Sequence, residues 1–387
     1  MVLLRRKATY IFPRMGYSYA AFESFFQILG YDVITPDPSN SQTLKRGVSN
    51  SPEGMCFPFK ILLGQFMKVL EENPDKYFKI VSLESYGPCR FGYYSPLYSK
   101  ILKDRGLNNF EIVNVEGIYP PWYKGIPRFF KKLIKLVGWH APWTGIRAFV
   151  IAGWKVYAIE ELERKLYHLI PREKITGSTE KAFKRAFERI HHAPNKVRAV
   201  KKILAEELER MDSVEHVEDL DLPKIGLVGE AYMLMDYSNN LEIEKKLAYM
   251  GVDVDRSLWV TNWTLDRIIR AKKHLNHMSE VNKGYLDFFI GGDGQESVMN
   301  TILYKQKGFD GVIQVQPFGC LPETAAKQIL SKVSKDYDIP VLSLSFDEQT
   351  GEAGFITRLE AFVDMIKERK LSKSGTREKK STAVVSH

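Results

Sequence analysis

The sequence predicts an α/β protein with two Rossmann-like parallel-sheet domains and a helical segment between them. Short apolar runs typical of buried strands alternate with runs of helical spacing near the N-terminus, and the same alternation returns after residue 223. Charged amphipathic runs fill the region between the two. The chain has 387 residues, which is too long for one ordinary hydrophobic core, so two domains are expected.

The N-terminal α/β domain is expected over residues 1–118. A strand, a helix and a second strand follow one another at its start, which favours a parallel sheet because parallel neighbours need a crossover connection. The expected strands are residues 8–12, 32–34, 78–83 and 110–115, and the expected helices are residues 17–29, 58–70 and 93–107.

Residues 119–222 are expected to form a helical insert or linker. Helical spacing is clearest over residues 160–169, 181–191 and 195–211. The most apolar stretch, residues 133–157, is interrupted by Trp139, His140, Pro142 and Arg147. It is therefore expected to form a buried or partly interfacial hairpin rather than a membrane helix.

The C-terminal α/β domain is expected over residues 223–370. Its expected strands are residues 224–230, 311–315 and 341–346, and its expected helices are residues 240–250, 322–331 and 357–369. From residue 371 the sequence turns to Ser, Lys, Gly and Thr, so residues 371–387 are predicted to be a disordered tail.

The formal net charge is +9, from 56 Lys and Arg against 47 Asp and Glu. A basic surface could bind a nucleic acid, an acidic cofactor or an acidic protein, or it could simply be solvated. No basic run is interleaved with aromatic residues in the manner of a nucleic-acid module, so no nucleic-acid partner is expected. The N-terminus lacks the pattern of a signal peptide, and the three cysteines are an odd number without short-range pairing. A cytoplasmic location is therefore expected, without a membrane partner.

Each of the three cysteines stands in a loop sequence that contains Gly and Pro. Cys89 and Cys320 come after expected strands, and Cys56 precedes an expected helix. Ligands of open α/β sheets bind beyond the carboxyl ends of the strands, and the N-terminus of a helix stabilises a thiolate. Three converging thiolates would suit an iron–sulfur cluster or another soft metal. The alternative is three unrelated buried thiols.

Two further loops of the second domain could line a cavity that faces the cysteines. The Gly-rich segment 291–297 could hold phosphate through backbone N–H groups, or it could be a plain turn from sheet to helix. It matches neither the P-loop nor the dinucleotide fingerprint. The acidic loop 347–354 could bind a hydroxyl or a metal, or it could cap the last helix and pair with Arg358 or Lys367. The candidates for the cavity are Glu296, Ser297 and Glu352.

Six stretches of the chain together resemble the 2-hydroxyacyl-CoA dehydratase-related family, whose members are often described as CoA-substrate-specific enzyme activase-related. They are Phe12-Pro13-Arg14-Met15, residues 50–58 with Cys56, residues 87–93 with Cys89, residues 292–297, residues 317–323 with Cys320, and residues 347–358. The resemblance runs from about residue 8 to residue 370 and omits much of the helical middle.

The resemblance implies that Cys56, Cys89 and Cys320 hold one 4Fe-4S cluster, or half of a sulfide-bridged double cubane. Gly54, Gly87 and Gly319 would let the backbone approach this cluster. In the family, an ATP-hydrolysing activator delivers an electron at low potential, and the dehydratases use it to remove water from a 2-hydroxyacyl thioester by a radical route.

The chain departs from the family pattern at two points. ATPase motifs are absent from the sequence, so a separate ATP-hydrolysing activator protein is expected as a partner. Asp293 stands where family members more often carry His, which puts a substrate role of that loop in question.

The resemblance therefore implies an anaerobic, ATP-coupled reductase or dehydratase component acting on an acyl-CoA or another small molecule, as a homo- or hetero-dimer. The alternatives are a non-catalytic electron-transfer or cluster-carrying partner, and a metal-free α/β scaffold that binds a ligand.

Overall fold

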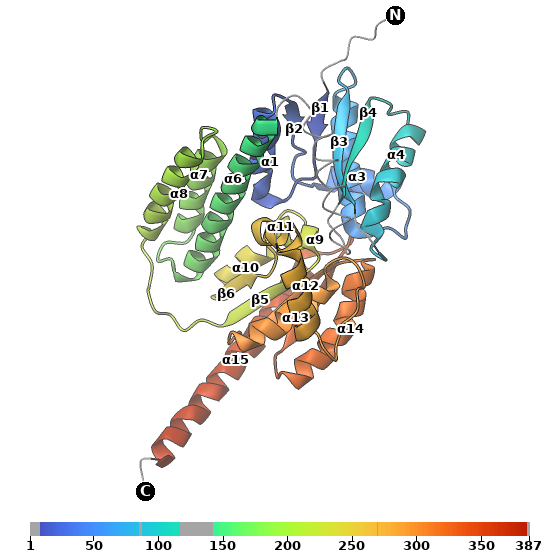
Figure 1. Ribbon diagram of the computed structural model, residues 1–387. Coiled ribbons are helices and arrows are strands. Elements are labelled where there is room, and N and C mark those ends of the chain that lie inside the picture. The colour runs from blue at the N-terminus through green and yellow to red at the C-terminus, as the bar shows by residue number, and fades with distance from the viewer. Residues whose placement is uncertain (1–7, 85–86, 117–141, 269, 385–387) are drawn as a thin grey trace, which may run out of the picture.

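The computed structural model describes residues 8–84, 87–116, 142–268 and 270–384. Figure 1 shows two sheet domains, one built by the first part of the chain and one by the last part, with the helices of the middle segment beside them. Each domain contains a four-stranded sheet in which every pair of strands is parallel. The predicted fold class, α/β with two Rossmann-like domains, is confirmed.

The first sheet consists of β1 (Thr9–Ile11), β2 (Asp32–Ile34), β3 (Phe78–Glu84) and β4 (Phe110–Glu116). Its strand order is β2-β1-β3-β4. The connections from β1 to β2 and from β2 to β3 thus lead to opposite sides of β1. Such a reversal creates a crevice at the carboxyl end of the central strands, where ligands of open α/β sheets bind.

The helices of the first domain are α1 (Tyr19–Ile28), α2 (Ser41–Asn50), α3 (Phe57–Glu72) and α4 (Tyr94–Asp104). Of these, α2 was not predicted, because its sequence is polar and short. A capping box formed by Asn40 and Thr43 starts it. The backbones of α2 and α3 meet at two glycines: a Cβ on Gly47 would lie 1.8 Å from the Lys60 carbonyl oxygen, and a Cβ on Gly64 would lie 1.9 Å from that of Thr43. Only glycine fits either position.

The second sheet consists of β5 (Lys224–Gly229), β6 (Asp253–Arg256), β7 (Gly311–Pro317) and β8 (Val341–Phe346). Its order, β6-β5-β7-β8, repeats the order of the first sheet. The edge strand β6 was not predicted, because three of its four residues are charged. The helices of this domain are α9 (Ala231–Met235), α10 (Ile243–Tyr249), α11 (Val260–Ile268), α12 (Ala271–Val281), α13 (Gly294–Gln306), α14 (Leu321–Asp336) and α15 (Glu352–Val384).

Residues 371–384, which belong to the predicted disordered tail, are the last part of α15 in the structure, and residues 385–387 lie outside the described residues. In Figure 1, α15 continues past the body of the domain and stays helical to Val384. The Lys, Arg and Glu residues of this stretch are good helix formers, and they extend a helix that the core has already nucleated.

The middle segment contains α6 (Pro142–Leu169), α7 (Ser178–His191) and α8 (Val197–Asp212). The predicted hairpin over residues 133–157 is corrected in part: residues 142–157 form the first half of the single helix α6, and residues 133–141 lie outside the described residues. The buried cluster of these three helices includes Ala20 of α1 and Ala248 of α10, so the segment packs on both domains. Within the described residues, no helix has the length and apolar character needed to span a bilayer.

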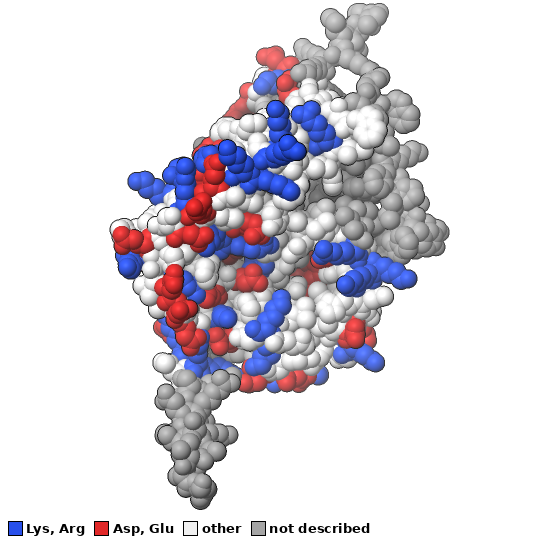
Figure 2. Space-filling view, turned by 60° about the vertical axis from the view of Figure 1, so that its left-hand side comes forward, with Lys and Arg blue, Asp and Glu red and all other residues white. Residues whose placement is uncertain are grey.

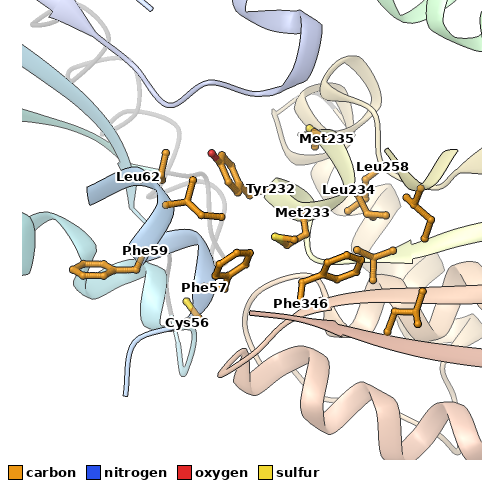
Figure 3. Packing of buried hydrophobic residues seen from close by; sticks show 14 of the residues in the cluster. Cys56, Phe57, Phe59, Leu62, Tyr232, Met233, Leu234, Met235, Leu258 and Phe346 are labelled. Atoms are coloured by element: carbon orange, nitrogen blue, oxygen red, sulfur yellow. The ribbon is translucent and has the colours of Figure 1, made fainter. Parts of the chain in front are cut away.

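A continuous core joins the two domains. Figure 3 shows Phe57 of α3 facing residues of the second domain across the junction, whereas the ring of Phe59 points away from them and stacks on Tyr98 of α4. The facing residues are Tyr232, Met233, Leu234 and Met235 of α9, Leu258 and Phe346. Cys56 belongs to the same buried cluster, which places the start of α3 at this junction.

Candidate metal centre

All three cysteines stand immediately before helices. Cys56 is the N-cap residue of α3, Cys320 that of α14, and Cys89 that of a short 3-10 helix, η2 (Arg90–Tyr93), which leads into α4. Proline in the first turn fixes the start of both α3 and α14. Cys89 and Cys320 occupy corresponding positions in the two domains, because each follows the third strand of its sheet, β3 or β7.

The loops that carry the cysteines meet at the junction of the two domains. The Phe57 N–H donates to the Phe318 carbonyl at 3.2 Å, which joins the loop of Cys56 to that of Cys320. Gly319 has φ +80°, and a Cβ there would lie 3.3 Å from the Cα of Cys56. A Cβ on Gly292 would lie 3.8 Å from the Sγ of Cys89. Residues far apart in sequence thus converge on one place.

Arg90 ties the three loops together. Its Nη1 donates to the carbonyl of Gly54, two residues before Cys56, and to the carbonyl of Gly319 at 3.1 Å. Arg90 itself follows Cys89 directly. A single guanidinium therefore links all three cysteine loops and both domains. Sequence reasoning did not single out Arg90, although it lies within the Cys89 motif.

The other two predicted glycines contribute in different ways. Gly87 has φ +87°, and a Cβ there would lie 2.9 Å from the ring of Phe289, so this glycine lets the Cys89 loop approach the second domain. Gly54 has open space where a Cβ would stand, so its contribution is the carbonyl that accepts from Arg90.

Burial is the main influence on the pKa values of the Cys56 and Cys320 thiols. Cys56 and Cys320 are buried and Cys89 is half-buried. Burial raises the pKa of the Cys56 thiol to about 11, and Glu230 and Cys89 add to this rise. Burial likewise raises the pKa of Cys320 well above its usual value, with Glu323, Glu230 and Cys56 contributing. The expectation that a helix N-terminus stabilises the Cys56 thiolate is therefore outweighed by desolvation in the free protein.

The buried hydroxyl of Tyr94 lies 2.6 Å from the sulfur of Cys56. Tyr94 belongs to α4, five residues after Cys89, and its ring packs edge-on against Phe59 and Phe91. This aromatic packing holds the hydroxyl against the sulfur, where it lowers the pKa of Cys56 but does not overcome burial. Sequence reasoning missed Tyr94, because nothing in the spacing of residues 56 and 94 indicates the contact.

Glu230 is a further side chain near the thiols that the sequence did not single out. It follows β5 at the carboxyl end of the sheet, and its carboxylate accepts the N–H of Met233 at 2.9 Å. Burial and the neighbouring Asp293 raise the pKa of Glu230 to about 7. The same carboxylate raises the pKa of Cys56, Cys320 and Tyr94. The sequence could have indicated Glu230, because this residue directly follows β5 at the carboxyl end of the sheet, where ligands of open α/β sheets bind.

The Gly-rich segment 291–297 leads into α13, as expected if it is a plain turn from sheet to helix rather than a phosphate-binding loop. Glu296 accepts from Arg267 at 3.1 Å and contacts His274 at 3.0 Å. The Ser297 hydroxyl donates to the Glu323 carboxylate at 3.0 Å. Both predicted cavity residues are thus held in a buried polar network behind the cysteine loops. Because carboxylates crowd this turn, it is a poor cradle for phosphate.

The acidic loop before α15 does not form the predicted pairs with Arg358 or Lys367, which instead donate to the carbonyls of Ser343 and Met250. Glu348 pairs with the buried Lys60 of α3 at 2.6 Å, which fastens this loop to the first domain. Glu352 pairs with Lys246 at 3.0 Å and its side chain is 61% exposed. Glu352 therefore lies on the surface at the start of α15 rather than in the buried centre.

The distances between ligand atoms differ between a site for a single metal ion and a site for an iron–sulfur cubane. Among the described residues, one group of at least three His, Cys, Asp or Glu side chains has ligand atoms within 4.8 Å of one another, namely Glu188, His191 and His192. The two imidazole rings stack at 19°, so their in-plane lone pairs do not converge on one ion. The three cysteine sulfurs do not form such a group, so at least two of them lie more than 4.8 Å apart. A cubane distributes its cysteines over separate irons, so wider spacing suits it better than a tetrahedral zinc ion.

Two family models match the chain. Residues 156–366 match the model for 2-hydroxyglutaryl-CoA dehydratase, D-component, and residues 14–85 match that for a CoA enzyme activase uncharacterised domain. The first match spans more than half of the 387 residues. The chain belongs to the 2-hydroxyglutaryl-CoA dehydratase D-component family. The comparison with curated proteins gave no match.

The D-component match covers Glu230 and Cys320, and the activase-domain match covers Cys56. Cys89 and Arg90 lie just beyond the second match. The D-component match also includes most of the helical segment, which the sequence resemblance had left out. The family relationship therefore extends through the helices that pack against both sheets.

Proposed function

We propose that this D-component-like protein holds a 4Fe-4S cluster on Cys56, Cys89 and Cys320 and acts in ATP-coupled, low-potential electron transfer as a dehydratase or reductase component. The observation that carries the proposal is the convergence of three cysteine loops from two domains, linked by the guanidinium of Arg90.

The residues at the junction fit such a group. The donors are three soft sulfur atoms, each at the start of a helix whose N-terminal dipole favours a negatively charged cluster. Gly319 and Gly292 let the backbone of their loops lie close to Cys56 and Cys89, because a Cβ at either position would be crowded by Arg90 and Cys56 or by Pro322. Because the buried thiols are protonated in the free protein, loading the site would release protons.

Three thiols for four irons leave one metal position without a cysteine ligand. When bound, the cluster would supply low-potential electrons and an iron able to bind a substrate oxygen. The protein contributes the surroundings. The Tyr94 hydroxyl lies 2.6 Å from the sulfur of Cys56, where it can donate to a metal-bound thiolate. Burial excludes water from Cys56 and Cys320, and Glu230 can hold or release a proton near the thiols. Two copies meeting at these sites would provide both halves of a double cubane.

A partner would reach the centre from its apolar rim. Large apolar side chains on and beside the cysteine loops are strongly exposed: Tyr93, Phe288, Phe289, Phe318 and Leu321. Exposed apolar patches of this kind mark interaction sites. Since the sequence contains no ATPase motif, we assign this rim to the separate ATP-hydrolysing activator, with an acyl-CoA or another small molecule as substrate.

The test is activator-driven reduction of the anaerobically purified protein, followed by electron paramagnetic resonance. With a purified activator ATPase and ATP, the signal of a reduced cluster is expected, and without ATP it is not. Phe318→Ser should retain iron but lose most of the ATP-driven signal, whereas Ile175→Ser, an exposed apolar residue on another loop, should behave as the wild type.

The same preparation distinguishes the possible roles. Conversion of a 2-hydroxyacyl-CoA would identify a dehydratase component, and reduction of small unsaturated molecules would identify a reductase. Electron transfer to a protein partner without either reaction would indicate a cluster carrier. A protein without iron, or an iron centre that the activator never reduces, would contradict the proposal.

A further inference from the structure

The first half of α6 presents a face of exposed apolar side chains. Its members lie three, four or seven residues apart, and therefore on one side of the helix. They are Trp143, Ile146, Phe149, Val150 and Tyr157, with exposed fractions of 81, 58, 49, 44 and 38%. From residue 161 the solvent side of the same helix turns polar, with Glu161, Arg164 and His168. The apolar exposure is thus confined to one half of α6.

Cations lie beside this apolar face, on α6 itself and on the side of α8. Arg147 of α6 donates to the carbonyl of Asn195, which places the start of α6 beside the connection from α7 to α8. Lys201 of α8 lies 4.0 Å over the ring of Trp154. Exposed cations at this end of the segment are Arg147, Lys196, Arg198, Lys201 and Lys202, and residues 191–202 contain no Asp or Glu. Figure 2 shows Lys and Arg gathered over the upper part of the face that carries these helices.

The shape and charge of this surface decide among possible occupants. Two copies of the chain meeting through it would bring two sets of like charges together, which opposes self-association. The side of a helix is convex, which suits a deformable lipid surface better than the rigid surface of a partner protein. A fluid, anionic lipid surface conforms to a convex face, accepts Trp, Tyr and aliphatic residues at its headgroup boundary and attracts cations.

We propose that the α6 face, defined as Trp143, Ile146, Phe149, Val150 and Tyr157 with the five flanking cations, docks the protein on an anionic lipid surface. The helix would lie along the interface and not cross the bilayer. This proposal departs from the expectation of no membrane partner. It is independent of the metal centre, because the face lies on the helical segment and involves no residue of the cysteine loops.

Vesicle flotation of the full chain tests the proposal. Vesicles of phosphatidylcholine with one third phosphatidylglycerol should bind the protein at low salt, and pure phosphatidylcholine should bind it weakly. Ile146→Ser with Val150→Ser should lower the partition coefficient at least tenfold. The double variant Arg198→Glu with Lys202→Glu should have a partition coefficient lower by about fivefold or more for each lost cation. Added salt should also lower the partition coefficient of the wild type.

Matched control variants lie at the opposite end of the helical segment. The apolar control is Ile175→Ser, which removes an exposed apolar side chain there. The charge control is the double variant Lys174→Glu with Lys181→Glu, which removes two exposed cations. Both control proteins should bind vesicles as the wild type does. Absence of binding to the anionic vesicles would overturn the proposal, as would equal losses in test and control variants. A dimer in solution that Ile146→Ser abolishes, without vesicle binding by the wild type, would also overturn it and assign the face to a second copy.

Discussion

Arg90 is the residue whose contacts best explain how three distant cysteines come together. Its guanidinium donates to carbonyls in the loops of Cys56 and Cys320 and belongs to the loop of Cys89. Both bonds come from Nη1, whose two N–H groups are fixed in the plane of the guanidinium, whereas the N–H groups of a lysine ammonium rotate on a flexible stem.

Arg90→Lys should therefore loosen the centre without unfolding the domains. We expect the loss of about 1.5–3 kcal/mol of interaction, the value of one hydrogen bond to a charged group. Reconstitution with iron and sulfide should then load less than half of the wild-type amount, with an unchanged far-ultraviolet circular dichroism spectrum. Arg105→Lys, an exposed arginine at the end of α4, is the control and should load normally. Full loading of the Arg90 variant would contradict this role.

Tyr94 offers a separate test at the residue scale. A hydrogen bond to a cysteine sulfur favours the more negative, reduced state of a cluster. Tyr94→Phe should lower the midpoint potential by roughly 50 mV, the equivalent of about 1 kcal/mol for one electron.

Tyr98→Phe provides the matched control for Tyr94. Tyr98 is equally buried and packs in the same aromatic group, but its hydroxyl donates to the Phe59 carbonyl at 3.3 Å instead of a sulfur. Its removal should leave the potential unchanged in a redox titration. Equal shifts in the two variants would show that packing, and not the bond to sulfur, sets the effect.

At the scale of helices and strands, apolar periodicity predicted the elements that build the cores. The strands β3, β4 and β8 match their predicted ranges to within a residue or so, because each is an apolar run bounded by turn residues. Among the elements that were not predicted, which also include α9, α11, α12 and α13, tertiary contacts define α2 and β6. In α2 these are the glycine contacts with α3, and in β6 they are ion pairs that bury its charged residues.

The candidate site was predictable to a similar degree. Gly- and Pro-flanked loops next to strands and helices indicated the three cysteines. Arg90, Tyr94 and Glu230 were not indicated, because each acts through a contact between segments far apart in the sequence. The sequence neighbourhood of Glu352 does not reveal that this side chain pairs with Lys246 and lies exposed at the start of α15.

An ion pair fastens the helical segment to the second domain. Arg172, which follows α6, contacts Asp253 of β6 through both carboxylate oxygens, at 2.5 and 2.7 Å. Burial alone would raise the pKa of Asp253, but Arg172 and His168 outweigh burial and hold this pKa well below its usual range. The bond thus stabilises the folded state wherever Asp253 is ionised.

Asp253→Asn should lower the free energy of unfolding by about 1–3 kcal/mol at neutral pH, since Asp253 is only partly buried. A depressed carboxyl pKa contributes stability above the unfolded-state value, near 4, and loses it as the pH falls further. The difference between wild type and variant in urea unfolding should therefore be constant from pH 7 to about pH 5 and shrink below pH 4. A difference that persists unchanged at pH 3 would contradict this account.

At the scale of the whole molecule, the centre lies where two similar sheets share one core. The order of strands is the same in both domains, and Cys89 and Cys320 follow equivalent strands, so the repeated topology places two of the three sulfurs on facing edges. The core that runs from α3 to α9 and β8 holds this arrangement, together with the Lys60–Glu348 pair. The proposed metal centre thus lies at the junction, and the α6 face lies apart from it on the helical segment.

The most direct test of the central claim is the iron and sulfide content of the anaerobically purified protein, measured with its electron paramagnetic resonance spectrum and with Cys56→Ser, Cys89→Ser and Cys320→Ser beside the wild type. The account predicts about four irons and four sulfides per wild-type chain, as one cubane requires, and loss of the cluster in each variant. A colourless wild type without iron, or a Cys320→Ser protein that keeps its full cluster, would contradict it.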